Sequence, residues 1–277
     1  MAGRKWLITG ISSGFGLEIS KQVLAEGDMV FGTVRNAKKI EALVKEYPET
    51  LIYRKLDITD TAGIRETVAE AFTKLGEIDI IVSNAGYGLY GAAEEISDEE
   101  ADLLIDTNLR GSIAFIRAAL PYLRKQRRGR IIQVASVAGQ VGYLGNALYN
   151  ASKFGITGYC EAVALEMAEF NVGVTIVEPG GARTDFRYGG AKVAANLMPE
   201  YEHAHGFLDM LDAGKGLAPG DPRKMAERII ENTQVNPAPR HLALGSKAIR
   251  EIIQELESRL QAYRAQVELA ASTDCDD

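Results

Sequence analysis

The chain has 277 residues, of which 46% are hydrophobic and 25% are charged. This composition is typical of an ordinary globular protein with room for one large α/β domain. Its formal net charge of −7 argues against a nucleic-acid partner or an anionic-membrane surface, and its apolar runs are too short for a signal peptide or a membrane span.

A glycine-rich turn follows the first apolar run, at residues 6–8, and an apolar-periodic segment begins at Leu17. This order predicts strand, tight turn and helix, the context in which glycines bring backbone close to a pyrophosphate at a helix N-terminus. A plain structural turn is the alternative. The turn residues expected to contact a nucleotide are Gly10, Ser12, Ser13, Gly14, Phe15 and Gly16.

Strand and helix patterns then alternate along the chain. Strands are predicted at 29–34, 51–56, 78–82, 130–135 and 172–178, and helices at 38–47, 61–75, 98 to about 123, and 148–168. The run at 78–82 is nearly all apolar, as in parallel strands buried on both faces. Repeated β–α–β units predict an α/β protein with a doubly wound parallel sheet, the Rossmann fold.

The regular alternation ends after Pro179 and Gly180. Residues 186–220 combine glycines with large apolar side chains, which favours a mobile lid over a hydrophobic substrate; a helical hairpin packed on the core is the alternative. A helix is expected after Asp221, a last strand at 241–244 and a terminal helix at 247–271 with a frayed tail. No linker divides the chain, so 1–277 is predicted to be a single domain.

Tyr149 and Lys153 lie four residues apart in a helical pattern and so project from the same face. A free phenol has a pKa near ~10, and a nearby ammonium favours the phenolate and lowers that pKa. Such a tyrosine can act as general acid toward a forming alkoxide or as base toward an alcohol. On spacing alone, a surface pair without a role is the alternative.

Four motifs in this order resemble those of the short-chain dehydrogenase/reductase family, in its compact single-domain branch. They are TGxxxGxG at 9–16, SNAG at 83–86 for the family's NNAG, Ser136 with the Tyr149-x-x-x-Lys153 pair, and Pro179-Gly180 with Thr184. The match covers residues 4–185 well and thins beyond them.

The resemblance implies a role for each matching residue. Tyr149 would donate the proton, Lys153 would lower its pKa and hold the nicotinamide ribose, and Ser136 would orient the substrate carbonyl. Asn108 would hold a water that relays protons through Lys153. The hydride itself would come from the nicotinamide of the cofactor. Further cofactor contacts are expected at Asn84, Ala85, Gly86, Pro179, Gly180 and Thr184, and substrate contacts at Ser136, Tyr143, Tyr149 and Phe186.

Cofactor choice can be argued from the end of the second strand. NAD-binding proteins usually place an acidic residue about twenty positions past the glycine turn, but here Arg35 ends the strand, with Lys38 and Lys39 close behind. Because Arg35 can pair with a 2′-phosphate, NADP is predicted and NAD is the alternative. Asp57, followed by Ile58, resembles the family position that binds the adenine amino group.

The function predicted is an NADP(H)-dependent oxidoreductase that interconverts a hydrophobic ketone or aldehyde and its alcohol. A non-catalytic NADP-binding regulator or scaffold is the alternative; an epimerase or dehydratase is disfavoured because the GxxGxxG spacing is absent. The lid region resembles bacterial relatives of 17β-hydroxysteroid dehydrogenases, without identifying a steroid. The family assembles through the helices of Asn108 and Tyr149, which implies a homodimer or homotetramer, with the 247–271 helix extending or changing that contact.

The two cysteines, Cys160 and Cys275, are far apart in sequence. No structural disulfide is expected, and the chain is predicted to be cytoplasmic, where thiols stay reduced. The three histidines lack metal-ligand spacing, so no metal is expected, and His203 and His205 are assigned to a surface loop.

Overall fold

The computed structural model describes residues 3–215 and 217–275. Its main sheet has seven parallel strands in the order β3-β2-β1-β4-β6-β7-β9. They are β1 (Lys5–Thr9), β2 (Met29–Val34), β3 (Leu51–Lys55), β4 (Ile80–Ser83), β6 (Gly129–Val134), β7 (Val172–Pro179) and β9 (His241–Leu244). The strand order reverses between β1 and β4, which opens a crevice at their carboxyl ends. The predicted doubly wound sheet is confirmed.

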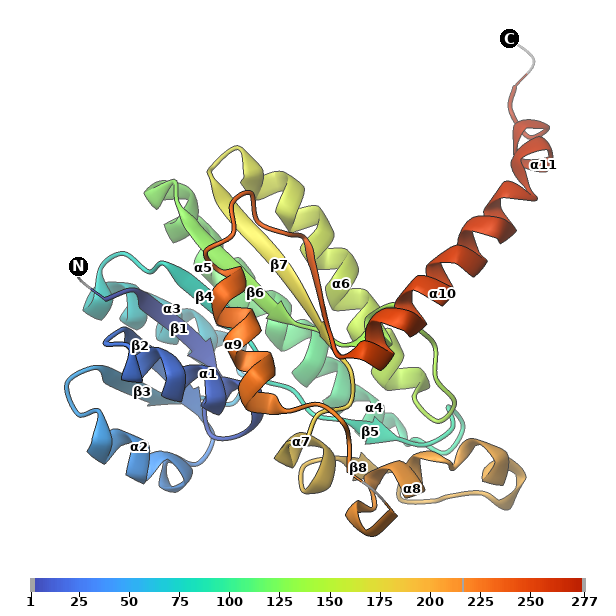
Figure 1. Ribbon diagram of the computed structural model, residues 1–277, viewed down its shortest axis with the longest axis horizontal. Coiled ribbons are helices and arrows are strands. Elements are labelled where there is room, and N and C mark those ends of the chain that lie inside the picture. The colour runs from blue at the N-terminus through green and yellow to red at the C-terminus, as the bar shows by residue number, and fades with distance from the viewer. Residues whose placement is uncertain (1–2, 216, 276–277) are drawn as a thin grey trace.

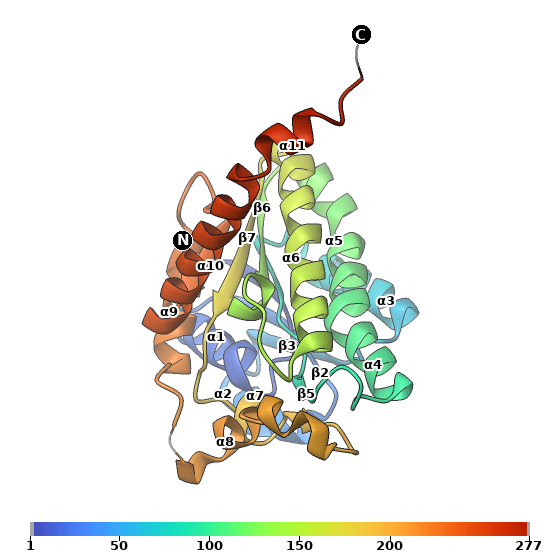
Figure 2. The same cartoon turned by 90° about the vertical axis from the view of Figure 1, so that its right-hand side faces the viewer.

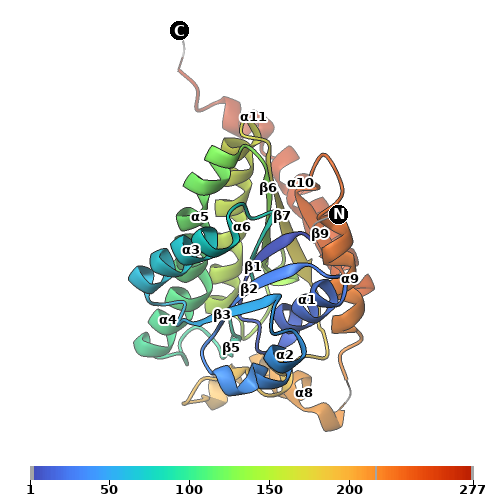
Figure 3. The same ribbon diagram turned by 90° about the vertical axis from the view of Figure 1, so that its left-hand side faces the viewer.

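Helices cover both faces of this sheet (Figures 1 and 3). One layer contains α1 (Gly14–Ala25), α2 (Glu41–Glu46) and α9 (Pro222–Asn232); the other contains α3 (Thr61–Leu75), α4 (Asp98–Ile105), α5 (Ser112–Gln126) and α6 (Ala147–Ala168). Successive residues of β1 serve opposite cores: Trp6 and Ile8 pack in the α1 and α9 layer, whereas Leu7 packs in the α3, α5 and α6 layer. Burial on both faces explains why the strands are apolar throughout.

The helix predicted from 98 to about 123 is interrupted. Ser97 and Glu100 form a capping box at its start, but α4 ends at Ile105, and η2 (Asp106–Gly111) is π-helical before α5 begins. Within η2, the Asn108 Oδ1 accepts from the Tyr87 backbone N–H at 3.0 Å and its Nδ2 donates to the Tyr87 carbonyl at 2.8 Å. These partners are distant in sequence, so local periodicity could not reveal the π segment.

The segment at 186–220 is neither irregular throughout nor a helical hairpin. It contains α7 (Asp185–Tyr188), β8 (Lys192–Val193), η4 (Pro199–Ala204), α8 (Phe207–Leu211) and η5 (Ala213–Lys215). Strand β8 pairs in parallel with β5 (Leu89–Tyr90) as a small second sheet, which lies beside the short lid helices at the lower edge of Figure 1. The predicted lid is thereby joined to the loop that follows β4.

Two other predicted helices differ in detail. The helix expected at 38–47 begins as a 3₁₀ turn, η1 (Ala37–Ile40), before α2. The terminal helix expected at 247–271 is divided into α10 (Ser246–Arg264) and α11 (Val267–Ala271). Figures 1 and 2 show α10 leaving the body of the molecule. Of the predicted frayed tail, residues 276 and 277 lie outside the described residues.

Candidate active site

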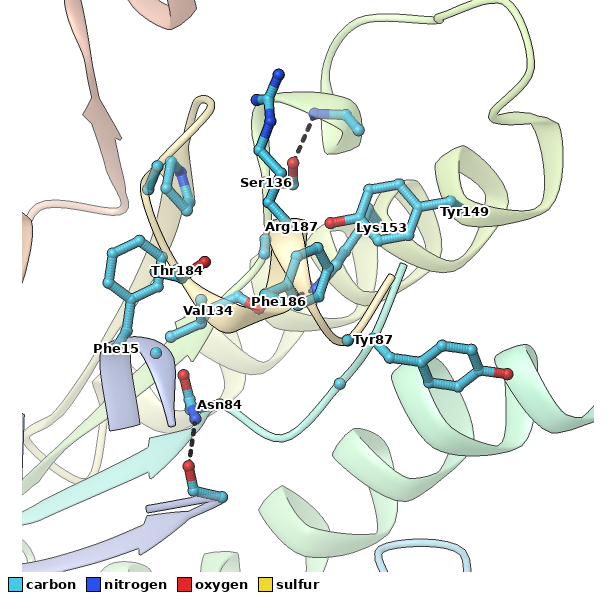
Figure 4. Close-up of a pocket in the computed structure, with 18 of the residues that line it drawn as sticks. Phe15, Asn84, Tyr87, Val134, Ser136, Tyr149, Lys153, Thr184, Phe186 and Arg187 are labelled. Carbon is cyan, nitrogen blue, oxygen red and sulfur yellow. Dashed lines mark hydrogen bonds between the residues drawn. The ribbon is translucent and has the colours of Figure 1, made fainter. Parts of the chain in front are cut away.

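A cavity of about 610 Å³ lies at the switch point of the sheet, within the size range of small-molecule sites. Its lining includes nearly every residue predicted to contact the cofactor. These are Gly10, Ser12, Ser13, Gly14, Phe15, Arg35, Asp57, Ile58, Asn84, Ala85, Gly86, Tyr149, Lys153, Pro179, Gly180 and Thr184. Figure 4 shows Phe15, Asn84 and Thr184 to one side, with Tyr149 and Phe186 to the other.

The glycine turn has the geometry that the sequence predicted. Gly10 and Gly14 adopt positive φ angles of 73° and 56°, and α1 begins at Gly14, so its free N–H groups face the turn. Gly16 does not line the cavity. A Cβ there would meet the Gly10 carbonyl and approach the Asn84 amide, so Gly16 allows close packing of helix on strand, and its contact with a nucleotide stays a prediction.

The SNAG segment braces this turn. The Asn84 Nδ2 donates to the carbonyls of Thr9 at 2.9 Å and Gly10 at 3.2 Å. In return, the Thr9 Oγ1 accepts from the backbone N–H groups of Asn84 at 2.9 Å and Ala85 at 3.0 Å. The carboxyl ends of β1 and β4 are thus cross-linked where a pyrophosphate would lie.

Arg35 and Asp57 line the end of the cavity beside β2 and β3. The Asp57 Oδ1 accepts from the Thr59 backbone N–H at 3.0 Å and from its hydroxyl at 2.8 Å. The backbone hydrogen bond from Thr59 lowers the pKa of Asp57, and the positive charge of Arg35 acts in the same direction. The carboxylate is therefore fixed in its ionised form, with a guanidinium nearby.

Tyr149 lies on α6 among aromatic rings. Its ring centroid is 6.4 Å from that of Tyr90 and 6.2 Å from that of Phe186, and its hydroxyl points toward Ser136 (Figure 4). Burial raises the pKa of Tyr149, Tyr90 adds to the rise, and a hydrogen bond with Ser136 opposes it. The lowered pKa that was expected for Tyr149 is therefore wrong for this structure, where burial raises it.

Lys153 is buried beside the cavity. Its Nζ donates to the Val134 carbonyl at 3.2 Å and lies 5.7 Å from the centroid of the Tyr149 ring. Burial lowers the pKa of Lys153 to about 8. An ammonium can donate three hydrogen bonds, so this group has capacity for ribose hydroxyls. A nicotinamide nucleotide therefore fits the donors present, and the glycine turn fits its pyrophosphate.

Replacing Lys153 with methionine should raise the free energy of unfolding at pH 7 by roughly 1–3 kcal/mol, because a buried ammonium is removed. The pKa of Lys153 falls from its ordinary 10.5 to about 8 in the folded protein. Between these pH values the folded protein binds fewer protons than the unfolded chain, so the free energy of unfolding of the wild type rises with pH. The difference in free energy of unfolding between Lys153→Met and the wild type therefore becomes smaller as the pH rises.

Urea denaturation at pH 7 and pH 10 measures this difference. The matched control is Lys125→Met, which removes an exposed ammonium from α5 and should behave alike at both pH values. An advantage for Lys153→Met that is as large at pH 10 as at pH 7 would contradict the assignment.

Asn108 does not line the cavity, although the resemblance implied that it holds a catalytic water. Its side chain is 1% exposed and is engaged by the Tyr87 backbone, with a further hydrogen bond from Nδ2 to the Ser152 Oγ at 3.4 Å. It therefore joins η2, the loop after β4 and α6. The proton relay stays a prediction, and the structure gives Asn108 a positioning contact.

All four predicted substrate residues, Ser136, Tyr143, Tyr149 and Phe186, line the cavity. The Tyr143 hydroxyl donates to the Glu251 Oε2 at 2.7 Å, and the first turns of α10 close that wall. Sequence reasoning missed the contribution of α10. The signal was available, because a last strand parallel to β7 brings its carboxyl end, and the helix after it, to the same edge of the sheet.

A buried carboxylate, Glu95, holds the 186–220 segment, the predicted lid, and was also missed. Its side chain is 0% exposed and accepts from the backbone N–H of Ala92 at 2.6 Å, the backbone N–H of Met198 at 2.6 Å and the His205 Nε2 at 2.7 Å. Burial raises the pKa of Glu95, but these donors outweigh it and the pKa is lowered. His205, expected in a surface loop, is a partly buried anchor of the lid.

Glu95→Ala should loosen the lid, because three donors lose a shared acceptor. We expect the KM for a carbonyl substrate to rise about tenfold, with NADPH affinity nearly unchanged, since a loss of about 1.4 kcal/mol is tenfold in affinity. Limited chymotrypsin digestion should cut faster after Tyr201 and Phe207. Glu94→Ala, which removes an exposed carboxylate that accepts from the Tyr201 hydroxyl at 2.6 Å, is the control. Equal digestion of the two variants would contradict the role of Glu95.

Other sequence expectations concern thiols, metals and membranes. Cys160 is buried and Cys275 is exposed, and both are free. Among the described residues, no group of three or more histidine, cysteine or acidic side chains could hold a metal ion. In that same part of the chain, no helix has both the length and the hydropathy needed to cross a bilayer.

Similarity to known proteins agrees with the fold and the site. The short chain dehydrogenase family matches residues 4–192. Retinol dehydrogenase 8 from Homo sapiens is 35% identical over 253 residues, covering 84% of this chain and 79% of that protein. A short-chain dehydrogenase from Streptomyces avermitilis has a crystal structure with a TM-score of 0.92 at 33% identity, covering 99% of both chains. The structure of ElxO with NADP bound, at 24% identity, shares the fold with a TM-score of 0.74 and covers 90% of this chain and 99% of its own. The chain therefore belongs to the short-chain dehydrogenase/reductase family of oxidoreductases, which act on alcohol and carbonyl groups.

Proposed function

We propose that this protein interconverts a hydrophobic ketone or aldehyde and its alcohol, with NADP(H) as the redox partner and Tyr149 as the general acid and base. One observation carries the proposal: the glycine turn, Ser136, Tyr149 and Lys153 line a single cavity at the switch point of the sheet. The intact tyrosine–lysine pair counts against the alternative of a non-catalytic NADP-binding regulator or scaffold.

In this mechanism the bound nicotinamide supplies or accepts the hydride. Ser136 orients the substrate oxygen, and Tyr149 gives its proton to that oxygen during reduction. Since burial raises the pKa of Tyr149, the phenol holds its proton until the oxygen becomes basic. The phenolate that remains is offset by the Lys153 ammonium, 5.7 Å from the ring centroid, which also holds the ribose hydroxyls.

The cofactor is assigned as NADP because of the charge beside β2. Arg35 lines the cavity where the adenosine ribose would lie, and Lys38 and Lys39 follow it in η1. A guanidinium pairs well with a phosphate, and no acidic residue ends β2 to accept the ribose hydroxyls as NAD requires. The glycine turn and Lys153 would hold the pyrophosphate and nicotinamide ribose, with Thr184 on the carboxamide.

The substrate is assigned as hydrophobic because of the rings and apolar groups around Tyr149. The cavity walls there include Tyr90, Leu103, Phe186 and Met210. Tyr90 in turn stacks on Phe207 of the lid, with ring centroids 5.7 Å apart. The relative from Homo sapiens is named for retinol, which is an apolar alcohol. That name supports the proposed class of hydrophobic substrate.

The test is NADPH oxidation by purified protein against apolar and polar aldehydes and ketones, followed by the loss of nicotinamide absorbance. We expect turnover of bulky apolar carbonyls, all-trans-retinal and steroid ketones among the probes, with NADPH preferred to NADH. Tight NADPH binding without turnover of any carbonyl or alcohol would favour the scaffold alternative.

We further propose a cytoplasmic location and a homodimer or homotetramer. A buried free Cys160 and an exposed free Cys275 suit a reducing compartment. Leu165, on the outer face of α6, is 67% exposed, which supports an assembly contact on the helix that carries Tyr149.

A further inference from the structure

The outer face of α10 and α11 carries an apolar stripe that nothing in the described chain covers. Its members recur at alternating spacings of four and three residues, which places those of α10 on one line of that helix, as at the a and d positions of a coiled coil, and the last of them begins α11. Their exposed fractions lie between 42% and 71%. The stripe comprises Ile249, Ile253, Leu256, Leu260, Tyr263 and Val267.

The stripe is not the face by which α10 contacts its own domain. That contact is made by Ala248 and Ile252, which are buried against Val137, and by Arg259, whose guanidinium donates to the Gln140 carbonyl at 2.6 Å. These residues follow a neighbouring line of the helix, about 100° away from the stripe. The domain therefore covers one flank of α10 and leaves the apolar line uncovered. The helix itself projects outward from the body of the molecule (Figures 1 and 2).

Two charges lie on the opposite flank of the stripe. Arg250 and Glu257 are seven residues apart, both are exposed, and neither pairs with an opposite charge in the part of the chain that the structure describes. By contrast, Lys247 pairs with Glu251 at 3.6 Å within the same helix. These two unlike charges flank the apolar stripe and are separated along the helix. They can both form ion pairs with a partner helix that carries the same two charges in the opposite order along the interface.

A second copy of this helix, running antiparallel, meets that condition. Layers that join Ile249 to Leu260 and Ile253 to Leu256 bring Arg250 of each copy opposite Glu257 of the other. A parallel pairing of the same stripe would place Arg259 beside Arg264 of the second copy, which is repulsive. The charges therefore select both the partner and its direction.

We propose that α10 is an interaction surface that pairs antiparallel with α10 of a second copy of this chain, through the stripe and two reciprocal Arg250–Glu257 contacts. The pairing has a consequence for the cavity. Ala248 and Glu251 of the same helix line it, and Glu251 holds the Tyr143 hydroxyl, so the contact would stiffen that wall.

The first experiment measures the mass of the full chain by analytical ultracentrifugation over a range of concentrations. We expect wild type to associate and the double variant Ile253→Glu/Leu256→Glu to lose the contact, so that a dimer becomes a monomer or a tetramer a dimer. The control, Gln254→Glu/Ser258→Glu, adds the same charge to exposed positions off the stripe. Circular dichroism verifies that each variant is folded. A wild-type monomer at every concentration, or an unchanged mass for the stripe variant, would overturn the proposal.

The second experiment tests the direction of pairing by charge reversal. Arg250→Glu alone and Glu257→Arg alone should each weaken association, because both reciprocal contacts become repulsive. Mixing the two variants should restore it, since every contact then joins Glu to Arg. If the mixture associates no better than the separate variants, the antiparallel arrangement is wrong. Activity plays no part in either readout, so these outcomes are independent of the proposed reaction.

Discussion

Tyr149→Phe should lower kcat for carbonyl reduction by about 10³-fold, the middle of the range that general acid–base catalysis contributes. Phenylalanine keeps the ring that packs near Tyr90 and Phe186 and removes only the hydroxyl that carries the proton. NADPH affinity should therefore hardly change. Single-turnover absorbance gives the rate, and nicotinamide fluorescence titration gives the affinity.

The control is Tyr122→Phe, which removes a hydroxyl from a ring stacked on Phe72 at 4.3 Å, outside the cavity lining. It should retain wild-type turnover. If Tyr149→Phe also turns over at the wild-type rate, Tyr149 is not the proton donor. If it loses NADPH binding together with turnover, the loss cannot be assigned to the chemical step and the role proposed for the hydroxyl fails.

Arg35→Asp should lower kcat/KM for NADPH by roughly 10²- to 10³-fold while changing that for NADH by only about threefold. The variant removes charge-assisted hydrogen bonds worth about 1.5–3 kcal/mol each and places a like charge beside the 2′-phosphate. An aspartate here can also accept from the ribose hydroxyls of NADH. Initial rates with each nucleotide at a saturating carbonyl measure the change.

Lys45→Asp provides the same change of charge on α2, at an exposed position outside the cavity lining. It should shift the two cofactors equally and slightly. Equal losses for NADPH and NADH in Arg35→Asp would undo the phosphate assignment, even if the protein remains folded and active.

The parts of the fold that could be predicted are those fixed by local pattern. The apolar run at 78–82 and the turn around Gly10 and Gly14 each carry their own signal, and the repeated β–α–β pattern around them predicted the doubly wound parallel sheet. The π segment around Asn108, the β5–β8 pair and the Glu95 clasp depend on partners far along the chain. Met198 lies 103 residues from the carboxylate that it contacts, so no local window contains the information.

The candidate site likewise has features that local sequence patterns predicted and features that depend on the three-dimensional structure. Helical spacing placed Tyr149 and Lys153 on one face, but spacing carries no information on solvent exposure. The direction of the Tyr149 pKa shift was therefore predicted wrongly, since burial of the phenol raises its pKa. Gly16 was assigned to the ligand by its motif, whereas its contacts are with the Gly10 carbonyl and Asn84. A glycine at this motif position can serve either ligand contact or close packing, and the sequence does not distinguish the two.

The small β5–β8 sheet has a consequence for the catalytic cycle. The backbone N–H groups of Lys192 and Ala194 donate at 2.8 Å to the carbonyls of Gly88 and Tyr90, so the lid is hydrogen-bonded to the wall of the cavity. If this segment opens during turnover, these hydrogen bonds must break first. Departure of the product would then set a ceiling on turnover, and chemically fast and moderately fast substrates would share one maximal rate while differing in KM.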